Sequence, residues 1–336
     1  MDVDYAHYEH GVRQDEDPVS LAEAATIPRH GGSFVWLELH EPTPVAMDEA
    51  RRHFGLHELA VEDAGQAHQR PKVEEYDGFH LIVYKTARYE ADGDPLVDFG
   101  ELEIFLGPGF LIVVRHGAAG DSRRARARAE AHPELLKTGA AAAVWAVLDV
   151  VVDDYAPVVE GLADEIEDLE RTVFSGEDEE DLTERFYLLK RELNEVYRAV
   201  HPLLAPLEAI ERGQFPQMDS RLMKYFRDIA DHVRRVQEEV LAQRDLLANA
   251  LEANLSLVNV RQSEVVAQQN QVVKQLTLVA TVFLPLTFVT GFFGQNFGWM
   301  VEHIASSTAF VLGGIGGLAV PCIALYVWFR RGGLAT

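Results

Sequence analysis

Polar residues interrupt the apolar C-terminal part of this sequence at one place. A long apolar run closes with Gly294, Gln295 and Asn296, and a single acidic residue, Glu302, precedes a second apolar run. Amide and carboxylate oxygens are the ligands that hard divalent cations prefer. The two glycines of the run, Gly291 and Gly294, allow the chain to turn at little steric cost. An asparagine after a glycine is also an ordinary turn residue, so cation binding and a simple turn both remain open.

Small and polar residues also recur along the first apolar run. Alternating steps of three and four place one set on a single helical face: Asn270, Val273, Thr277, Ala280, Leu284, Thr287 and Gly291. Bulkier neighbours such as Leu276, Val279, Phe283 and Phe288 suit lipid or the second apolar run. The face has two interpretations, a seam for helix packing or the lining of a pore. A pore requires several copies of this helix around an axis.

The two apolar runs are long enough to cross a bilayer. Residues 275–301 and 304–329 contain no charged side chain, and each run exceeds the ~20 residues that a spanning helix needs. Lys274 precedes the first run, and Arg330 and Arg331 follow the second. The positive-inside rule therefore predicts a multi-pass protein of the inner or plasma membrane, with both termini in the cytoplasm.

Composition excludes several classes of protein. The 336 residues carry 30 basic and 54 acidic side chains, a net charge of −24, which argues against a nucleic-acid partner and suits contact with cations. A solvated acidic surface would have the same charge. The single cysteine, Cys322, excludes a disulfide framework, and the 13 histidines form no HExxH motif. No phosphate-binding loop or Ser/His/Asp motif is present, so we expect no enzyme, no ATP-driven pump and no organic cofactor.

The segment before the apolar runs divides into two parts. Apolar segments rich in β-branched and aromatic residues predict strands, and LGPGF predicts a hairpin between the last two: 34–39, 79–89, 100–106 and 110–115. Helical segments near residues 47–53 and 56–65 complete a predicted α/β domain over residues 1–139. A helical hairpin is predicted over 140–218, with a first long helix that kinks at Pro157 and a second helix from 178 to 211.

The longest predicted element joins the two regions. No glycine or proline occurs from 217 to 284, so residues 219–284 predict one helix of 66 residues, about 100 Å long. We expect a stalk helix that continues into the first span over 219–294. An outer loop over 295–307, a second span over 308–329 and a cytosolic tail over 330–336 complete an α+β membrane protein.

The stretch TVFLPLTFVTGFFGQNF, followed by MVE, resembles the membrane hairpin of the CorA-type divalent-cation transporters. Further segments are similar to that family in the same order: FVWLELHEPT, VEDAGQAHQRPKVEEYDGFHLIVYK, LDVVVDDY, LADEIEDLE and YFRDIADH. The resemblance implies a funnel-shaped homopentamer in the lipid bilayer that conducts Mg²⁺, and also Co²⁺ and Ni²⁺. It implies a selectivity filter at Gly294, Gln295 and Asn296, with the axial face as the pore lining and Glu302 attracting cations.

The sequence departs from the family pattern at the filter. Gln295 stands where the main branch has Met, Phe293 where it usually has Tyr, and Val301 where Pro is usual. Asn296 is retained, and its neutral oxygen would hold a hydrated Mg²⁺ through the water shell, since Mg²⁺ sheds its waters reluctantly. Because the zinc-transporting branch also varies the middle position, a Zn²⁺ transporter, proton-coupled or not, is the alternative. A non-conducting membrane scaffold is a third interpretation.

The resemblance also implies regulation by intracellular divalent cations. In the family, acidic side chains clamp regulatory Mg²⁺ between cytosolic domains of neighbouring subunits, and loss of the metal opens the pore. The matching residues here are Glu62, Asp63, Asp149 and Asp228. Carboxylates brought together repel one another until a cation neutralises them, so the ion can bias two packings of the subunits. Each of these residues alone would also suit a solvated helix face.

Overall fold

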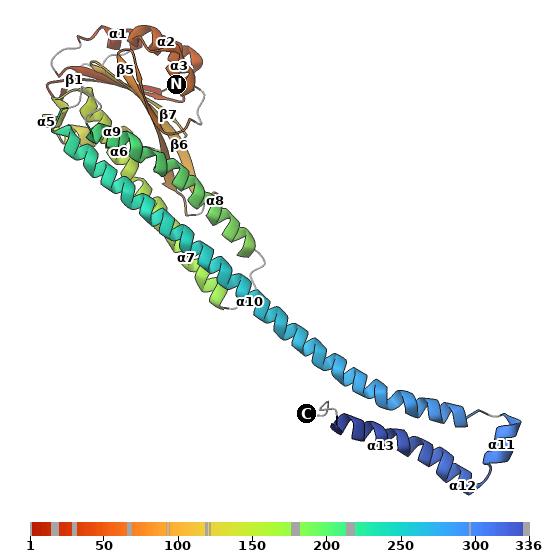
Figure 1. The fold of residues 1–336 in the computed structure, drawn as a ribbon. Helices are drawn as coiled ribbons and strands as arrows, with labels where there is room; N and C mark the ends of the chain where they lie inside the picture. Colours follow the sequence, from red (N-terminus) through yellow and green to blue (C-terminus); the bar gives the residue numbers. More distant parts are fainter. Residues whose placement is uncertain are drawn as a thin grey trace. The chain divides into compact units, whose positions relative to one another are not determined.

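The computed structural model describes residues 2–14, 20–28, 32–65, 69–91, 93, 95–117, 120, 122–175, 182–212, 219–295 and 297–331 (Figure 1). Its contacts divide the chain into two units, Met1–Ala253 and Asn254–Thr336. The first unit contains the whole sheet and most of the helices. The second unit contains the C-terminal part of the longest helix and the second apolar segment.

The first unit is built on a seven-stranded mixed sheet with strand order β2-β1-β3-β7-β6-β5-β4. The strands are β1 (Asp2–Glu9), β2 (Val12–Arg13), β3 (Phe34–His40), β4 (Lys72–Tyr76), β5 (Phe79–Tyr89), β6 (Val97–Gly107) and β7 (Phe110–His116). Strands β3 and β7 pair in parallel, whereas the other neighbours are antiparallel. The four predicted strands and the predicted hairpin are confirmed. Strands β1, β2 and β4 were not predicted from the sequence.

Helices cover both faces of the sheet, which explains why its central strands are buried almost throughout. One face packs against α1 (Leu21–Thr26), α2 (Pro44–Phe54) and α3 (Glu58–Gly65), with Leu37, Phe105 and Ile112 in the shared core. The helices of the other face begin with α4 (Ser122–Glu130), α5 (Pro133–Leu136) and α6 (Ala140–Asp153). Close packing of the next helix requires Gly161, where a Cβ would lie 2.5 Å from the Tyr89 ring.

The predicted helical hairpin is more interrupted than expected. The first helix divides at Asp154 into α6 and α7 (Tyr155–Ser175), so the prediction of one continuous kinked helix was wrong. Pro157 explains the break because it has no N–H to donate to the preceding turn. The second arm consists of α8 (Leu182–Val200), the 3₁₀ turn η1 (His201–Leu203) and α9 (Leu204–Glu211). The predicted start of this arm at residue 178 lies outside the described residues.

The long predicted helix is confirmed as α10 (Leu222–Phe293), with 72 residues. It begins three residues later than predicted and runs through Pro285 to the start of the predicted filter. Its first part buries one stripe in the first unit: Leu222, Phe226, Ile229, Ala230, Val233, Val236, Val240, Gln243, Leu247 and Ala250. The steps of three and four between these residues are those of a helix with one face in a core.

The second unit contains both apolar segments. After α10, the described chain forms α11 (Gly298–Ile304), α12 (Ser307–Ala309), the π-helical turn η2 (Phe310–Ile315) and α13 (Gly316–Arg331). Two helical stretches are long and apolar enough to span a membrane, the end of α10 and Ser307–Trp328. The predicted outer loop over 295–307 therefore includes a short helix.

Candidate functional site

The predicted filter begins where α10 ends. The Gly294 N–H donates to the Thr290 carbonyl oxygen at 2.9 Å, and the Gln295 N–H donates to that of Phe292 at 3.3 Å. A Cβ at position 294 would lie only 3.1 Å from the Thr290 oxygen, so this turn favours glycine. Asn296 lies outside the described residues, and its predicted contact with a cation stays a prediction. Glu302 lies on α11 and is exposed.

The seven residues of the predicted pore face are all exposed in the single chain: Asn270, Val273, Thr277, Ala280, Leu284, Thr287 and Gly291. A different face of the same helix is partly covered, and its residues are Leu278, Thr281, Val282, Pro285, Leu286 and Val289. Val289 contacts the second apolar segment, because a Cβ at Gly317 would lie 3.4 Å from its Cγ1 atom. The small and polar face is therefore not the seam between this chain's own apolar helices.

The bulky neighbours of this face were predicted to face either lipid or the second apolar segment. Leu276, Val279, Phe283 and Phe288 are all exposed, which suits lipid or other copies rather than the second apolar segment. On the pore face, the Thr287 hydroxyl donates to the Phe283 carbonyl oxygen at 2.8 Å. With its hydrogen used in this way, the hydroxyl oxygen keeps its lone pairs for an ion or a water molecule.

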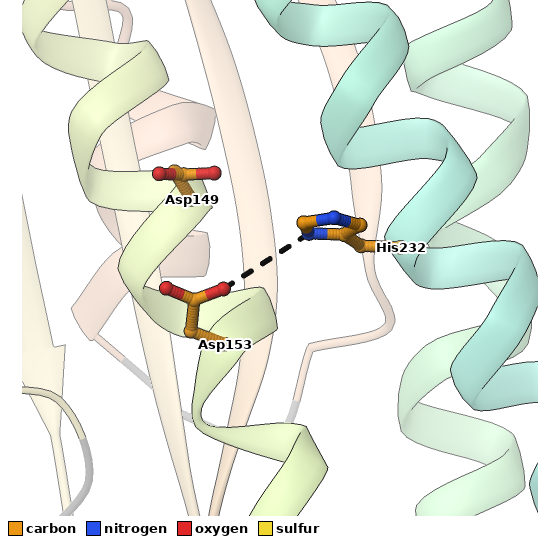
Figure 2. A group of neighbouring side chains, drawn as sticks. All are labelled: Asp149, Asp153 and His232. Carbon is orange, nitrogen blue, oxygen red and sulfur yellow. Dashed lines mark ion pairs between the residues drawn. The ribbon is translucent and has the colours of Figure 1, made fainter.

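A second group of potential ligands lies in the first unit. Asp149 and Asp153 project from α6 towards His232 of α10, as Figure 2 shows, and one potential ligand atom from each residue lies within 4.8 Å of the other two. His232 also lies near Asp228, with Nε2 4.0 Å from Oδ2. The structure therefore brings two of the predicted regulatory residues, Asp149 and Asp228, to the same histidine. We call Asp149, Asp153, Asp228 and His232 the acidic cluster.

Two members of the acidic cluster, Asp153 and His232, were not predicted from the sequence. Asp153 follows Asp149 by four residues, and His232 follows Asp228 by four. Residues four apart lie on the same helical face, so this spacing was a usable signal. The ring of His232 has its Nδ1 4.0 Å from an oxygen of Asp153, which links α10 to α6.

The acidic cluster already contacts one cation, Arg128 of α4. The guanidinium pairs with Asp149 and, at 2.8 Å, with Asp153. Burial raises the pKa of the Asp149 carboxyl, and Arg128 opposes this rise, while the charges of Asp153 and Asp228 add to it. Two of the three carboxylates of the cluster thus pair with this guanidinium. Two carboxylates and an imidazole fit a divalent ion if the Arg128 guanidinium moves away from at least one of the carboxylates. The imidazole suits Zn²⁺ or Ni²⁺ better than Mg²⁺.

The other two predicted regulatory residues lie elsewhere on the first unit. Glu62 and Asp63 are on α3, and Asp63 accepts a hydrogen bond from Lys72 of β4 at 2.7 Å. Neither residue contributes a ligand atom to the Asp149, Asp153 and His232 group within the described chain. Their joint action with Asp228 across a subunit interface stays a prediction.

A further charged group lies inside the sheet and had no counterpart in the sequence analysis. Glu101 of β6 accepts from Lys85 of β5 and, at 2.9 Å, from the Gln69 N–H. Glu103 is fully buried beside it, and neither of its oxygens has a donor among the described groups when it is ionised. Burial raises the pKa of Glu103 to about 10, helped by its hydrogen bond to Glu101, so Glu103 is a neutral acid at pH 7. We call Lys85, Glu101 and Glu103 the sheet cluster.

Comparisons with known proteins agree with this arrangement. The family model described as "CorA-like Mg2+ transporter protein" matches residues 31–331. A curated relative, the cobalt/magnesium transport protein CorA of Thermotoga maritima, is 32% identical over 251 residues, which cover 74% of this chain and 69% of that protein.

Solved structures share the fold. The complete structure of the CorA magnesium transporter from Methanocaldococcus jannaschii superposes with a TM-score of 0.65 at 21% identity and covers 98% of each chain. The cytoplasmic domain of ZntB from Vibrio parahaemolyticus superposes with a TM-score of 0.56 at 12% identity, over 76% of this chain and 97% of that one. Because the family model matches residues 31–331 of the chain, the protein belongs to the CorA-like Mg²⁺ transporter family and is a membrane protein with two C-terminal transmembrane helices.

Proposed function

We propose that this protein is a homopentameric channel that conducts Mg²⁺, and also Co²⁺ and Ni²⁺, across the inner or plasma membrane. The carrying observation is the exposed small and polar face of α10, which is distinct from the face that the chain's own second apolar segment partly covers. Copies of α10 arranged around an axis would turn this face inward. Membership of a transporter family supports transport as the function of this chain, rather than an enzymatic reaction.

The filter in this proposal is formed by Gly294, Gln295 and Asn296 of each subunit. Asn296 would accept hydrogen bonds from the water shell of the ion, because Mg²⁺ is costly to dehydrate. The exposed Glu302 would concentrate cations outside. Lys274 before the first span and Arg331 after the second support an orientation with the first unit and both termini in the cytoplasm.

The proposed gate responds to intracellular divalent cations. Asp149, Asp153, Asp228 and His232 are gathered within one chain, where they would hold a regulatory metal ion. Glu62 and Asp63 of a neighbouring subunit would add carboxylates to this group. When bound, the ion would supply positive charge that relieves repulsion between subunits, and its loss would favour the open packing.

A Zn²⁺ transporter is the second candidate, and one observation favours it. The acidic cluster contains an imidazole, His232, and a histidine ligand suits Zn²⁺ and Ni²⁺. This observation bears on the regulatory metal more directly than on the transported one, since the predicted pore face contains no histidine. Mg²⁺ therefore remains the proposed substrate.

The decisive experiment is metal uptake into proteoliposomes that contain the full-length protein. Initial rates are compared for Mg²⁺, Co²⁺, Ni²⁺ and Zn²⁺, with and without a pH gradient. We expect Mg²⁺ uptake that needs no gradient. Uptake of Zn²⁺ alone, driven by protons, would select the second candidate. Absence of uptake of every metal would favour a scaffold and contradict the channel.

Substitutions at Asn296 test the filter. Asn296→Ala should reduce uptake by about a hundredfold, a loss of the size seen when a positioned polar contact is removed. Asn296→Asp should strengthen cation binding and slow conduction, because it adds one negative charge per subunit. The control is Asn194→Ala, which removes a side-chain hydrogen bond to the Lys190 carbonyl on α8. Equal uptake by Asn296→Ala and the control would place selectivity elsewhere, for example at Thr287 or Asn270.

Two further measurements test the assembly and the gate. The mass of the detergent-solubilised complex should correspond to a pentamer, and a monomer or dimer as the sole species would contradict the pore. Mg²⁺ should protect the first unit of the parent from protease. The double variant Asp63→Ala/Asp228→Ala should lose this protection, and a retained metal response would show that the two residues are not the clamp.

A further inference from the structure

The last residue of α10, Phe293, packs against the second apolar segment directly before the filter. A Cβ at Gly313 would lie 3.3 Å from Cζ of the Phe293 ring and 3.4 Å from Cε1. One turn later, a Cβ at Gly317 would lie 3.9 Å from Cε2 of the same ring and 3.4 Å from Val289. Gly313 and Gly317 thus present bare backbone to α10, and we call this pair the glycine notch.

The neighbouring glycines do not share this contact. A Cβ at Gly314 would meet Phe310 of its own segment at 3.6 Å, and one at Gly316 would meet the Val311 carbonyl oxygen at 3.6 Å. Both distances are ordinary contacts within the segment. Gly313 lies in the π-helical turn η2, a rare form that frequently occurs at functional sites. Of the four glycines, only Gly313 has an approach tighter than an ordinary contact, and that approach is to the Phe293 ring of α10.

The burial of the aromatic rings agrees with an anchoring role for Phe293. Phe293 is 37% exposed in the single chain, whereas Phe292 is 50% and Phe288 is 72% exposed. Two backbone hydrogen bonds, at 2.9 Å and 3.3 Å, also hold the turn that follows the helix. The ring seated on the notch is the nearest side-chain anchor for the backbone that starts the filter.

We propose that the glycine notch positions the ion filter by fixing the ring of Phe293. This inference rests on the proposed filter and adds Gly313, Gly317 and Phe293 to it as positioning residues. The geometry also accounts for Phe at position 293, where the CorA-type pattern usually has Tyr. A tyrosine hydroxyl would extend from Cζ, the ring atom nearest to the Cβ position of Gly313.

The test is a comparison of two adjacent substitutions in the full-length protein, Gly313→Ala and Gly314→Ala. Both add one methyl group to the same π-helical turn, but only the first adds it against Phe293. Uptake into proteoliposomes is measured as a function of Mg²⁺ concentration. Gly313→Ala should raise the half-saturating concentration about tenfold, the size expected for overpacking. Gly314→Ala should leave this concentration unchanged.

A rescue separates positioning from a purely structural role. Phe293→Leu in the Gly313→Ala background removes the clashing ring and should return the half-saturating concentration towards that of the parent. Loss of assembled protein alone would lower the maximal rate and leave half-saturation unchanged. Phe293→Tyr alone should raise half-saturation as Gly313→Ala does, and it is the deciding variant if Gly313→Ala fails to assemble.

Two results of these measurements would overturn the inference. Parent-like half-saturation in both Gly313→Ala and Phe293→Tyr, or equal effects of Gly313→Ala and Gly314→Ala, would show that the notch does not position the filter. A parent protein that takes up no Mg²⁺ contradicts the proposed function itself, which is a different result. If uptake is lost in Asn296→Ala but is unaffected by the notch variants, the proposed filter stands and only the proposed role of the glycine notch is contradicted.

Discussion

The acidic cluster and the sheet cluster each contain several carboxyl groups close to one basic side chain, and the charge of those carboxyl groups is balanced to different extents. The sheet cluster pairs one carboxylate, Glu101, with Lys85 and keeps its second acid, Glu103, neutral by protonation. The acidic cluster has three carboxylates, and its guanidinium, Arg128, pairs with two of them. Of the two, only the acidic cluster has an excess of negative charge that a metal ion could neutralise.

Burial explains the difference between the two clusters. The side chains of Glu101 and Glu103 are 3% and 0% exposed, so an unpaired charge there is costly and Glu103 binds a proton instead. In the acidic cluster, Asp153 is 37% and Asp228 is 67% exposed, and water stabilises their charges. A site that exchanges a cation must keep its carboxylates ionised, and this requires the wetter position.

Replacing Lys85 should produce the largest effect. Lys85→Met keeps the apolar stem but leaves the buried Glu101 carboxylate without its cation, so the free energy of unfolding should fall by about 3 kcal/mol. Thermal unfolding of the solubilised protein measures this loss. The control is Lys72→Met, which removes a more exposed pair with Asp63 and should cost less than about 1 kcal/mol. Equal losses would contradict the contrast between buried and exposed pairs.

Substitution of Glu103 should change the pH dependence of stability. The folded-state pKa of Glu103 is raised to about 10 from the ordinary value of 4.5, so the folded protein retains a proton that the unfolded chain releases. Its contribution to stability is therefore complete below about pH 4.5 and declines as the pH rises towards 10. Relative to the parent, Glu103→Gln should gain about 2 kcal/mol between about pH 5 and about pH 6.5, at about 1.4 kcal/mol for each pH unit. Parallel stability curves would show that Glu103 is ionised in the fold.

Removal of Arg128 should have a smaller effect, which a metal ion should reverse. Arg128→Gln leaves Asp149 and Asp153 facing each other, and unfolding without divalent ions should become easier by about 1 kcal/mol. Added Mg²⁺ or Ni²⁺ should restore stability and raise the melting temperature more than in the parent, because a bound ligand stabilises the folded state. Arg185→Gln, which removes a pair with Asp168 on the helical hairpin, is the control without a nearby metal group. A metal response no larger than that of the parent would exclude competition between Arg128 and the ion.

The smallest expected effect separates two metals at His232. His232→Gln keeps a hydrogen-bonding side chain but removes the imidazole, so stabilisation by Ni²⁺ or Zn²⁺ should weaken more than stabilisation by Mg²⁺. Melting temperatures at matched concentrations of each metal would measure the difference. Equal weakening for all three metals would show that His232 supports the cluster without ligating an ion.

Much of the fold was predictable because the strongest patterns are local. The absence of glycine and proline from 217 to 284 predicted α10, and apolar segments predicted β3, β5, β6 and β7. Strands β1 and β4 were missed because acidic residues recur in DVDYAHYE and KVEEY, which resemble solvated segments. They form only by pairing with β3 and β5, a contact that no local pattern encodes.

The site was predictable to the extent that helical spacing or family resemblance carried it. Asp149 and Asp228 were identified by resemblance, and the four-residue spacing of Asp153 and His232 would have added them. The role of Arg128 could not be predicted, because α4 meets α6 only in the folded chain. Glu103 escaped for a related reason, since a glutamate in a strand normally indicates a solvent-facing position, whereas here helices cover both faces.

The uninterrupted course of α10 also limits how the protein can vary in length. Each residue of an α-helix advances the chain by 1.5 Å and about 100°. One residue inserted between Val233 and Val236 would therefore rotate every later position of the buried stripe by about 100° and turn Val240 and Leu247 away from the core. Insertions of seven residues, close to two turns, would nearly restore the phase. The alignment of the buried residues of α10 on one face is thus encoded simply by the number of residues between them.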